Sequence, residues 1–312
     1  MNLDRRRLLQ TGVLALLFSL RYRLDTAWAV PVTIRHGQGE QTFQDVPKTV
    51  AVFDLAGLDT LDALGVSVAG VPDFTMPPLL ARYAGKGYEK IGSLFEPDYE
   101  AVSALSPDLI IVGGRSRPKY TELARIAPTI DLSGDATHPY PSDLATISTL
   151  GQIFGKPAEA TALVARIEAS VARLREKTAN AGRGLFVLAT GGRLSAYGPG
   201  SRFGMVHDVF GVTPAVPDIK AGIHGQPISF EFIQKADPDW LFVLDRDAAI
   251  GHQKDGTPAA ALLDNAIIAQ TTAWKKKQVV YLDAAAWYLS GGGAQSLQGS
   301  LDQLLTAFSA AP

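Results

Sequence analysis

Three arginines follow predicted strands or lie in a glycine-rich loop, and their placement suggests an anion-binding cleft. Arg115 and Arg246 each come just after an apolar run, and Arg202 lies in the glycine-rich segment 198–204. A guanidinium group keeps its charge at physiological pH and offers a planar fork of donors to anionic oxygens. If the three side chains line one cleft, we expect it to bind an anion with several oxygen acceptors. For any one of these arginines, the alternative is that its side chain is solvated or forms a structural ion pair.

The sequence predicts alternating strands and helices, and these elements determine where the arginines lie. Short apolar runs separated by helical stretches predict α/β units with largely parallel sheets. The predicted strands are 50–53, 66–71, 109–112, 185–188, 241–244 and 279–282, and 56–64 is a predicted helix. Ligands of open α/β sheets bind outside the carboxyl ends of the strands, which is where Arg115 and Arg246 are expected.

The chain contains an internal repeat. Residues 98–115 and 229–246 each predict a short helix, a Pro-Asp turn, a buried strand and an arginine just past the strand. Aligning the two Pro-Asp pairs superposes the two arginines and also superposes Glu100 on Glu231. Each half alone is a common α/β pattern, but the shared positions of Glu and Arg favour two related lobes.

A long helix is predicted between the two lobes. After Pro157, residues up to 181 contain no proline or glycine, and four apolar residues fall at helical spacing, namely Leu163, Ile167, Val171 and Leu174. We therefore expect an α/β fold of two Rossmann-like lobes with mainly parallel sheets, joined by one long helix. The expected bounds are 30–156 for the N-terminal lobe, 157–181 for the helix and 182–312 for the C-terminal lobe. One rigid helix permits only small hinge motion; the alternative is a surface helix within a single domain.

The first 29 residues predict a cleaved export signal. Arginines at 5–7 precede a short apolar run at 12–20, and Ala-Trp-Ala at 27–29 fits a signal-peptidase site, so the mature chain would begin at Val30. The apolar run is too short to span a bilayer. The order Arg-Arg-x-Leu-Leu fits twin-arginine export, with an ordinary Sec signal as the alternative.

Charge and cysteine content narrow the function classes. The chain has a net charge of −2, and the part beyond the predicted signal is more acidic, which argues against nucleic acid or an anionic membrane as partner. The absence of cysteine excludes disulfides and thiolate metal sites, and it predicts that no lipid anchor is attached. Five scattered histidines do not suggest a zinc or manganese site. We expect a soluble periplasmic monomer without a membrane anchor or intrinsic cofactor.

Three stretches carry a resemblance to a known family. They are 195–204 (SAYGPGSRFG), 238–246 (PDWLFVLDR), and 280–283 (VYLD) with 287–292 (WYLSGG). On these stretches the chain resembles the class III periplasmic binding proteins, from about residue 45 to the C-terminus. It is most similar to the branch that binds catecholate siderophores of the petrobactin or enterobactin type. The resemblance implies a protein that captures a ferric siderophore between its lobes and delivers it to the permease dimer of an inner-membrane ABC importer.

The resemblance also implies roles for four further residues. His224 and Tyr288 match family members in which a histidine and a tyrosine complete the coordination of iron held by a bis-catecholate. The alternative is that both only line the cleft and form hydrogen bonds. Glu100 and Glu231 match glutamates that dock onto permease arginines; the alternative is that each only interacts favourably with the dipole of its helix.

Two other function classes stay open from sequence alone. Haem or cobalamin could replace the siderophore, because His224 or Tyr288 could serve as an axial ligand of haem. A twin-arginine-exported enzyme is the second alternative, although the sequence lacks the G-x-S-x-G, G-x-x-x-x-G-K-[ST] and H-E-x-x-H motifs and a cysteine nucleophile. We therefore expect no enzymatic activity.

Overall fold

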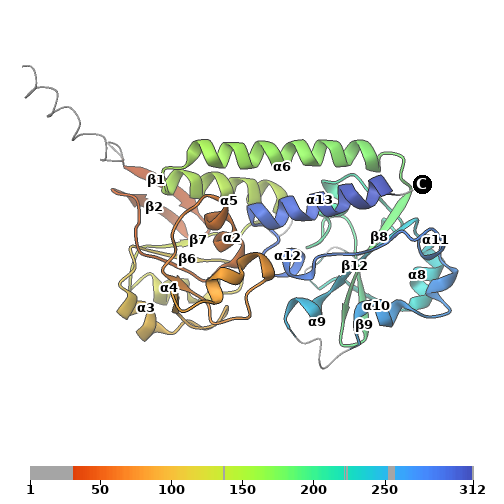
Figure 1. Ribbon diagram of the computed structural model, residues 1–312, viewed down its shortest axis with the longest axis horizontal. Helices are drawn as coiled ribbons and strands as arrows, with labels where there is room; N and C mark the ends of the chain where they lie inside the picture. The colour runs from red at the N-terminus through yellow and green to blue at the C-terminus, as the bar shows by residue number, and fades with distance from the viewer. Residues whose placement is uncertain (1–30, 136–137, 221, 223, 252–256, 311–312) are drawn as a thin grey trace, which may run out of the picture.

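The computed structural model describes residues 31–135, 138–220, 222, 224–251 and 257–310. They form two lobes that lie side by side, joined along one face by the long helix α6 (Pro157–Thr178) (Figure 1). The two-lobed α/β architecture predicted from the sequence is confirmed. The predicted export signal lies outside the described residues.

The N-terminal lobe is built on a five-stranded parallel sheet with the strand order β5-β4-β3-β6-β7. Its strands are β3 (Val50–Val52), β4 (Gly70–Val71), β5 (Glu89–Lys90), β6 (Leu109–Val112) and β7 (Thr129–Asp131). Its helices are α2 (Leu55–Ala63), η1 (Pro78–Ala84), α3 (Tyr99–Leu105), η2 (Arg117–Lys119), α4 (Tyr120–Leu123) and α5 (Pro139–Ile153). An antiparallel hairpin, β1 (Val32–His36) and β2 (Gly39–Phe43), precedes this sheet. All four residues of β6 are buried, as expected for a parallel strand covered on both faces.

The C-terminal lobe has a mixed sheet with the order β11-β9-β8-β12-β13, and β10 also pairs with β8. Its strands are β8 (Arg183–Thr190), β9 (Arg193–Tyr197), β10 (Thr213–Pro214), β11 (Gln226–Ile228), β12 (Trp240–Asp245) and β13 (Val279–Tyr281). Its helices are α7 (Met205–Asp208), α8 (Phe230–Ala236), α9 (Arg246–Ala249), α10 (Ala259–Leu263), η3 (Ile268–Gln270), α11 (Thr272–Lys275), α12 (Ala284–Tyr288) and α13 (Ala294–Ala310). Strand β12 pairs parallel to β8 and β13 pairs parallel to β12, as predicted, and the short strand β10, which was not predicted, also pairs parallel to β8.

Antiparallel pairing in this lobe was not predicted. Strands β8 and β9 form a hairpin in which Thr190 pairs with Arg193, so the turn consists of Gly191 and Gly192. Both glycines have positive φ, 53° and 74°, which is what a tight two-residue hairpin turn requires. Strand β11 then adds antiparallel to β9.

Helix α6 begins at Pro157 as predicted and ends at Thr178, three residues before the predicted end. Its buried residues include Ile167, Val171 and Leu174, which confirms the helical spacing read from the sequence. It packs against α5 and α13 (Figure 1). The lobe boundaries at 156 and 182 stay a prediction, because α13, at the end of the chain, packs on α2 of the N-terminal lobe.

A buried carboxylate fixes the start of α13. Asp59 of α2 accepts hydrogen bonds from the backbone N of Gln295 (2.7 Å) and from the backbone N and hydroxyl of Ser296 (2.9 and 2.6 Å). Thr60 Oγ1 accepts from the backbone N of Ala294 (3.2 Å). These bonds satisfy N–H groups that a helix start leaves without an internal partner. The start of α13, which follows α12 of the C-terminal lobe, is therefore held by α2 of the N-terminal lobe.

The internal repeat has a structural basis. In each lobe the aspartate of the Pro-Asp pair accepts hydrogen bonds from the backbone near the start of a neighbouring strand. Asp108 accepts from the backbone N of Lys48 and of Thr49, just before β3, each at 2.9 Å. Asp239 accepts from the backbone N of Arg183, the first residue of β8, also at 2.9 Å. These bonds lower the pKa of both carboxyls. The helices before the two pairs both end in a left-handed residue, Ser106 and Asp237. The same helix–turn–strand unit is thus present in both lobes.

Candidate functional site

The short helix α12 presents Tyr288 between the two lobes. Asp283 caps the helix by accepting a hydrogen bond from a first-turn amide. Trp287 is only 7 % exposed and contacts the rings of Phe186 and Phe210 in the core (centroid distances 5.6 and 6.3 Å). The next residue, Tyr288, is only partly buried. The buried indole therefore anchors the helix that carries the tyrosine.

Three arginines from separate elements converge on the ring of Tyr288. Arg115 comes from the loop after β6 in the N-terminal lobe, Arg202 from the loop after β9, and Arg246 from the first position of α9. Their guanidinium carbons lie 5.8, 4.6 and 5.4 Å from the ring centroid, respectively. These distances are within the range of cation–π attraction. The structure thus brings together the three arginines singled out in the sequence.

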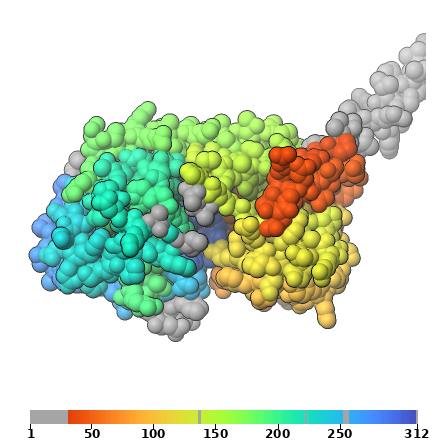
Figure 2. Space-filling view, turned by 180° about the vertical axis from the view of Figure 1, so that it is seen from behind, coloured from red at the N-terminus to blue at the C-terminus, as the bar shows by residue number. Residues whose placement is uncertain are grey.

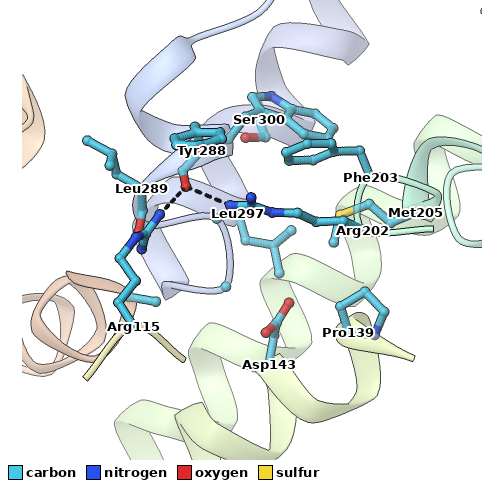
Figure 3. Close-up of a pocket in the computed structure, with 14 residues that line it drawn as sticks. Arg115, Pro139, Asp143, Arg202, Phe203, Met205, Tyr288, Leu289, Leu297 and Ser300 are labelled. Carbon is cyan, nitrogen blue, oxygen red and sulfur yellow. Dashed lines mark hydrogen bonds between the residues drawn. The ribbon is translucent and has the colours of Figure 1, made fainter. Parts of the chain in front are cut away.

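Hydrogen bonds hold the arginines around α12. Arg246 Nε donates to the Tyr288 hydroxyl (2.8 Å), whereas Arg115 Nη2 and Arg202 Nη2 donate to the Tyr288 carbonyl oxygen (2.8 and 3.1 Å; Figure 3). Arg115 Nη1 also donates to the carbonyl oxygen of Leu289 (3.3 Å). Because Arg115 belongs to the N-terminal lobe, its bonds to α12 tie the two lobes together.

The loop that carries Arg202 is shaped by its glycines and polar neighbours. Gly200 has φ of 67°, and its backbone N donates to Asp208 Oδ2 (2.7 Å). The hydroxyl of Ser201 donates to the carbonyl oxygen of Gly198 (2.6 Å). A left-handed conformation at Gly200 is easily adopted only by glycine. This explains why a glycine-rich sequence precedes the arginine.

Arg115 and Arg246 are positioned by tight turns at the carboxyl ends of their strands. After β6, Ser116 Oγ accepts from the backbone N of Gly113 (3.1 Å) within the turn that contains Arg115. After β12, Asp245 caps α9 by accepting from the backbone N of Ala248 (3.0 Å). Both arginines therefore lie where ligands of open α/β sheets bind, as expected from the sequence.

A cavity of about 190 Å³ lies between the lobes beside these arginines. It is lined from both lobes, by Ala56, Arg115, Pro139, Asp143, Arg202, Phe203, Met205, Trp287, Tyr288, Leu289, Gly291, Gly292, Leu297 and Ser300 (Figure 3). Seen from the opposite face in Figure 2, the lobes are separated by a notch below the helices that join them. Sequence reasoning missed Asp143 and Met205, which carry no local signal, and Phe203, which is adjacent to Arg202.

The arginines change the acidity of the tyrosine. Burial acts to raise the pKa of Tyr288, but the hydrogen bond from Arg246 and the charges of Arg246 and Arg202 outweigh it, so that the pKa is lowered. For Arg115, in contrast, burial disfavours the charged form and lowers the pKa, and the positive charge of Arg202 lowers it further. The cleft thus concentrates positive charge around a phenol that ionises more readily than an ordinary tyrosine.

The other predicted site residues lie elsewhere. His224 is exposed in the loop before β11 and is not among the residues that line the cavity. Glu100 and Glu231 are exposed in the first turns of α3 and α8, at equivalent positions of the two lobes. The Ser229 hydroxyl and the helix backbone lower the pKa of Glu231.

Two further observations concern metals and membranes. Within the described ranges, no group of three or more histidine, aspartate or glutamate side chains is placed to hold a metal ion. In the same part of the chain, no helix combines the length and apolar character needed to cross a bilayer.

Comparison with known proteins identifies the family. Residues 50–286 match the family described as periplasmic binding protein. This chain belongs to that family. The binding protein is 42 % identical over 254 residues to the petrobactin-binding protein YclQ of Bacillus subtilis, covering 80 % of this chain and 79 % of YclQ. It is 35 % identical over 286 residues to the ferric-anguibactin-binding protein FatB of Vibrio anguillarum, covering 89 % and 88 % of the two chains.

Solved structures agree with this assignment. The crystal structure of YclQ matches the binding protein with a TM-score of 0.85 at 39 % identity, covering 89 % of this chain and 99 % of YclQ. The periplasmic catecholate-siderophore-binding protein VctP of Vibrio cholerae matches with a TM-score of 0.82 at 33 % identity, covering 90 % and 100 %. The family resemblance read from the sequence motifs is confirmed.

Proposed function

We infer that this periplasmic binding protein captures a ferric siderophore of the catecholate type between its lobes and delivers it to an inner-membrane ABC importer for iron uptake. The observation that carries the proposal is the convergence of Arg115, Arg202 and Arg246 on Tyr288 in the cleft. A ferric tris-catecholate is a trianion with many oxygen acceptors, and three guanidinium groups match its charge and can stack on its rings. Relatives named for petrobactin, ferric anguibactin and catecholate siderophores support the same ligand class.

The size of the cavity implies movement on binding. At about 190 Å³ it is smaller than the roughly 300–1,000 Å³ of common small-molecule sites. We propose that Arg115 and Arg202 release the carbonyl oxygens of Tyr288 and Leu289 and donate to the ligand instead. Arg115 would then separate from Leu289 and Tyr288, and the lobes would open slightly about α6.

Iron coordination is the second part of the proposal. A bis-catecholate leaves two positions of ferric iron open, and the phenolate of Tyr288 is suited to fill one of them. His224 would fill the other after its exposed loop moves toward the cleft. No intrinsic cofactor is needed, because iron is the transported cargo.

A ligand titration tests the proposed function. The chain from Val30 would be titrated with a ferric bis-catecholate, a ferric tris-catecholate, a ferric hydroxamate and haem, with tryptophan fluorescence as the signal. Trp287 lies against the cavity and should be quenched by ligand. We expect submicromolar binding of catecholates and weak binding of the hydroxamate. Binding of haem alone would contradict the proposal, and so would a lack of response to every ligand.

The two exposed glutamates are proposed to dock the loaded protein onto the permease dimer. Charges at the edge of an interface mainly guide association and fix its register. Replacing both Glu100 and Glu231 by alanine should reduce iron uptake by roughly tenfold at limiting protein while leaving siderophore affinity unchanged. The matched control is Glu122→Ala with Glu176→Ala, two exposed glutamates on other helices. Equal uptake by both double variants would refute the docking role.

Export precedes this function in the proposal. We propose that residues 1–29 direct the chain through the twin-arginine pathway into the periplasm and are then removed. N-terminal sequencing of the exported protein should give Val30 as its first residue. A chain that still begins at Met1, or that stays in the cytoplasm, would contradict the proposal.

A further inference from the structure

Asp143 is a carboxylate in the cavity wall with no evident structural role. It lies on α5 of the N-terminal lobe and lines the same cavity as Arg115 and Arg202. Figure 3 shows its side chain pointing into the cavity from the side opposite Tyr288. The cavity therefore carries positive charge on one side and a carboxyl group on the other.

The side chain of Asp143, which is half-buried, lacks the partners that the buried carboxylates have. Asp59 accepts three hydrogen bonds, and Asp131 is bonded to Gln38 and pairs with Arg117 (3.3 Å). Among the described residues, by contrast, no side-chain hydrogen bond or ion pair involves Asp143. Burial and the charge of Asp54 raise its pKa to about 7. A carboxyl group in this position is costly to ionise unless a cation is brought to it.

Neighbouring residues hold Asp143 in place without neutralising it. A Cβ atom on Gly292 would overlap Asp143 Oδ1, so the carboxyl group packs directly against the backbone of the loop between α12 and α13. Trp287, which lines the same cavity, has a buried indole Nε1 without a hydrogen-bond partner among the described residues. Asp143 thus leaves an unpaired carboxyl group in the wall of a cavity that also holds the arginines, and an unpaired polar group facing a cavity is expected of a ligand site.

We propose that Asp143 forms a cation subsite of this cavity, which takes a protonated amine carried by the siderophore. The ligand would be zwitterionic: its ferric catecholate part meets the arginines, and its ammonium group pairs with Asp143. This inference rests on the proposed function and narrows the ligand to catecholate siderophores whose backbone contains a basic nitrogen. An analogue whose backbone places an apolar group at the same point would lack this ion pair and bind less tightly.

A pair of matched ligands tests the subsite. The first probe is the ferric complex of a bis-catecholamide whose linker contains one secondary amine. The second has a linker of the same length with a methylene group in place of the amine. The wild-type protein should bind the amine complex on the order of 10-fold more tightly, as expected for a hydrogen bond to a charged group. Asp143→Asn should remove this preference by weakening only the amine complex.

Controls separate this inference from the proposed function. Glu176→Gln removes the same negative charge from an exposed position on α6, and this variant should keep the full preference for the amine complex. Asparagine has nearly the volume of aspartate, and a thermal melt of each variant checks folding; Asp143→Ser is the substitute if the first variant is unstable. Equal binding of the two probes by the wild type would overturn the subsite but leave the proposed function intact. If the Asp143 variant still prefers the amine complex, the subsite is likewise overturned and the proposed function stands. If neither probe binds the wild type, the result counts against the proposed function itself.

Discussion

Replacing Arg246 by alanine should weaken the binding of a ferric tris-catecholate by about 3 kcal/mol, on the order of 100-fold in Kd. Arg246 donates to the Tyr288 hydroxyl (2.8 Å) and to Thr190 Oγ1 (3.3 Å), and its side chain is 37 % exposed. Both partners are side-chain groups that can rotate, so Arg246 can turn to a ligand without breaking a backbone contact. A trianionic ligand in a partly dehydrated cleft then loses a charge-assisted donor when the arginine is removed.

Arg246 is a cleaner test than Arg115. Arg115 donates to two backbone carbonyl oxygens of the opposite lobe, so its removal would loosen the lobes as well as the ligand. For Arg246→Ala we expect haem affinity to fall by only about 10-fold, because haem offers two propionate groups to the arginines whereas the tris-catecholate complex is a trianion. Isothermal titration with both ligands measures the difference. Arg166→Ala, an exposed arginine on α6, is the control. Equal losses for the two ligands would argue against recognition of a tris-catecholate.

The positions of the arginines could be predicted because the end of a strand and the loop that follows it are local properties. The buried run 109–112 and the run 240–245 form parallel strands, and residues just past such strands meet at one edge of the sheet. The helix from Pro157 could be predicted for a similar reason, since its apolar spacing is contained within the segment itself. Features encoded within about 20 residues were thus accessible from one sequence.

Long-range contacts could not be predicted in this way. Arg115 donates to a carbonyl oxygen 173 residues later in the chain, and Asp59 caps a helix 236 residues away. Neither partner is marked by a motif, because any backbone amide or carbonyl can serve. Asp143 was missed for the same reason, since a single aspartate on a helix gives no sign of the cavity it faces. The β8–β9 hairpin did have a signal, the pair Gly191-Gly192, which the expectation of parallel strands obscured.

Replacing Tyr288 by phenylalanine should weaken the binding of a ferric bis-catecholate by on the order of 10- to 100-fold, the loss of metal affinity that is typical when a group supporting the metal is removed. The ring remains for the arginines to stack on, so the variant removes only the hydroxyl that accepts from Arg246. A tris-catecholate already fills the coordination sphere of iron and should lose only a few-fold in affinity. Absorption spectroscopy provides the direct readout: besides the catecholate-to-iron bands, the bis-catecholate complex of the wild type should show a phenolate-to-iron charge-transfer band that the variant lacks.

The acidity of Tyr288 adds a pH dependence to the same experiment. Coordination of iron by the phenolate releases one proton, so affinity for the bis-catecholate should rise with pH until the tyrosine is ionised. The lowered pKa of Tyr288 reduces the cost of this proton release near neutral pH. The phenylalanine variant should lack this part of the pH slope, whereas Tyr281→Phe, at a tyrosine that is 40 % exposed on β13, should retain it. An unchanged band and slope in the Tyr288 variant would mean that the hydroxyl only orients Arg246, and the arginines alone would then hold the ligand.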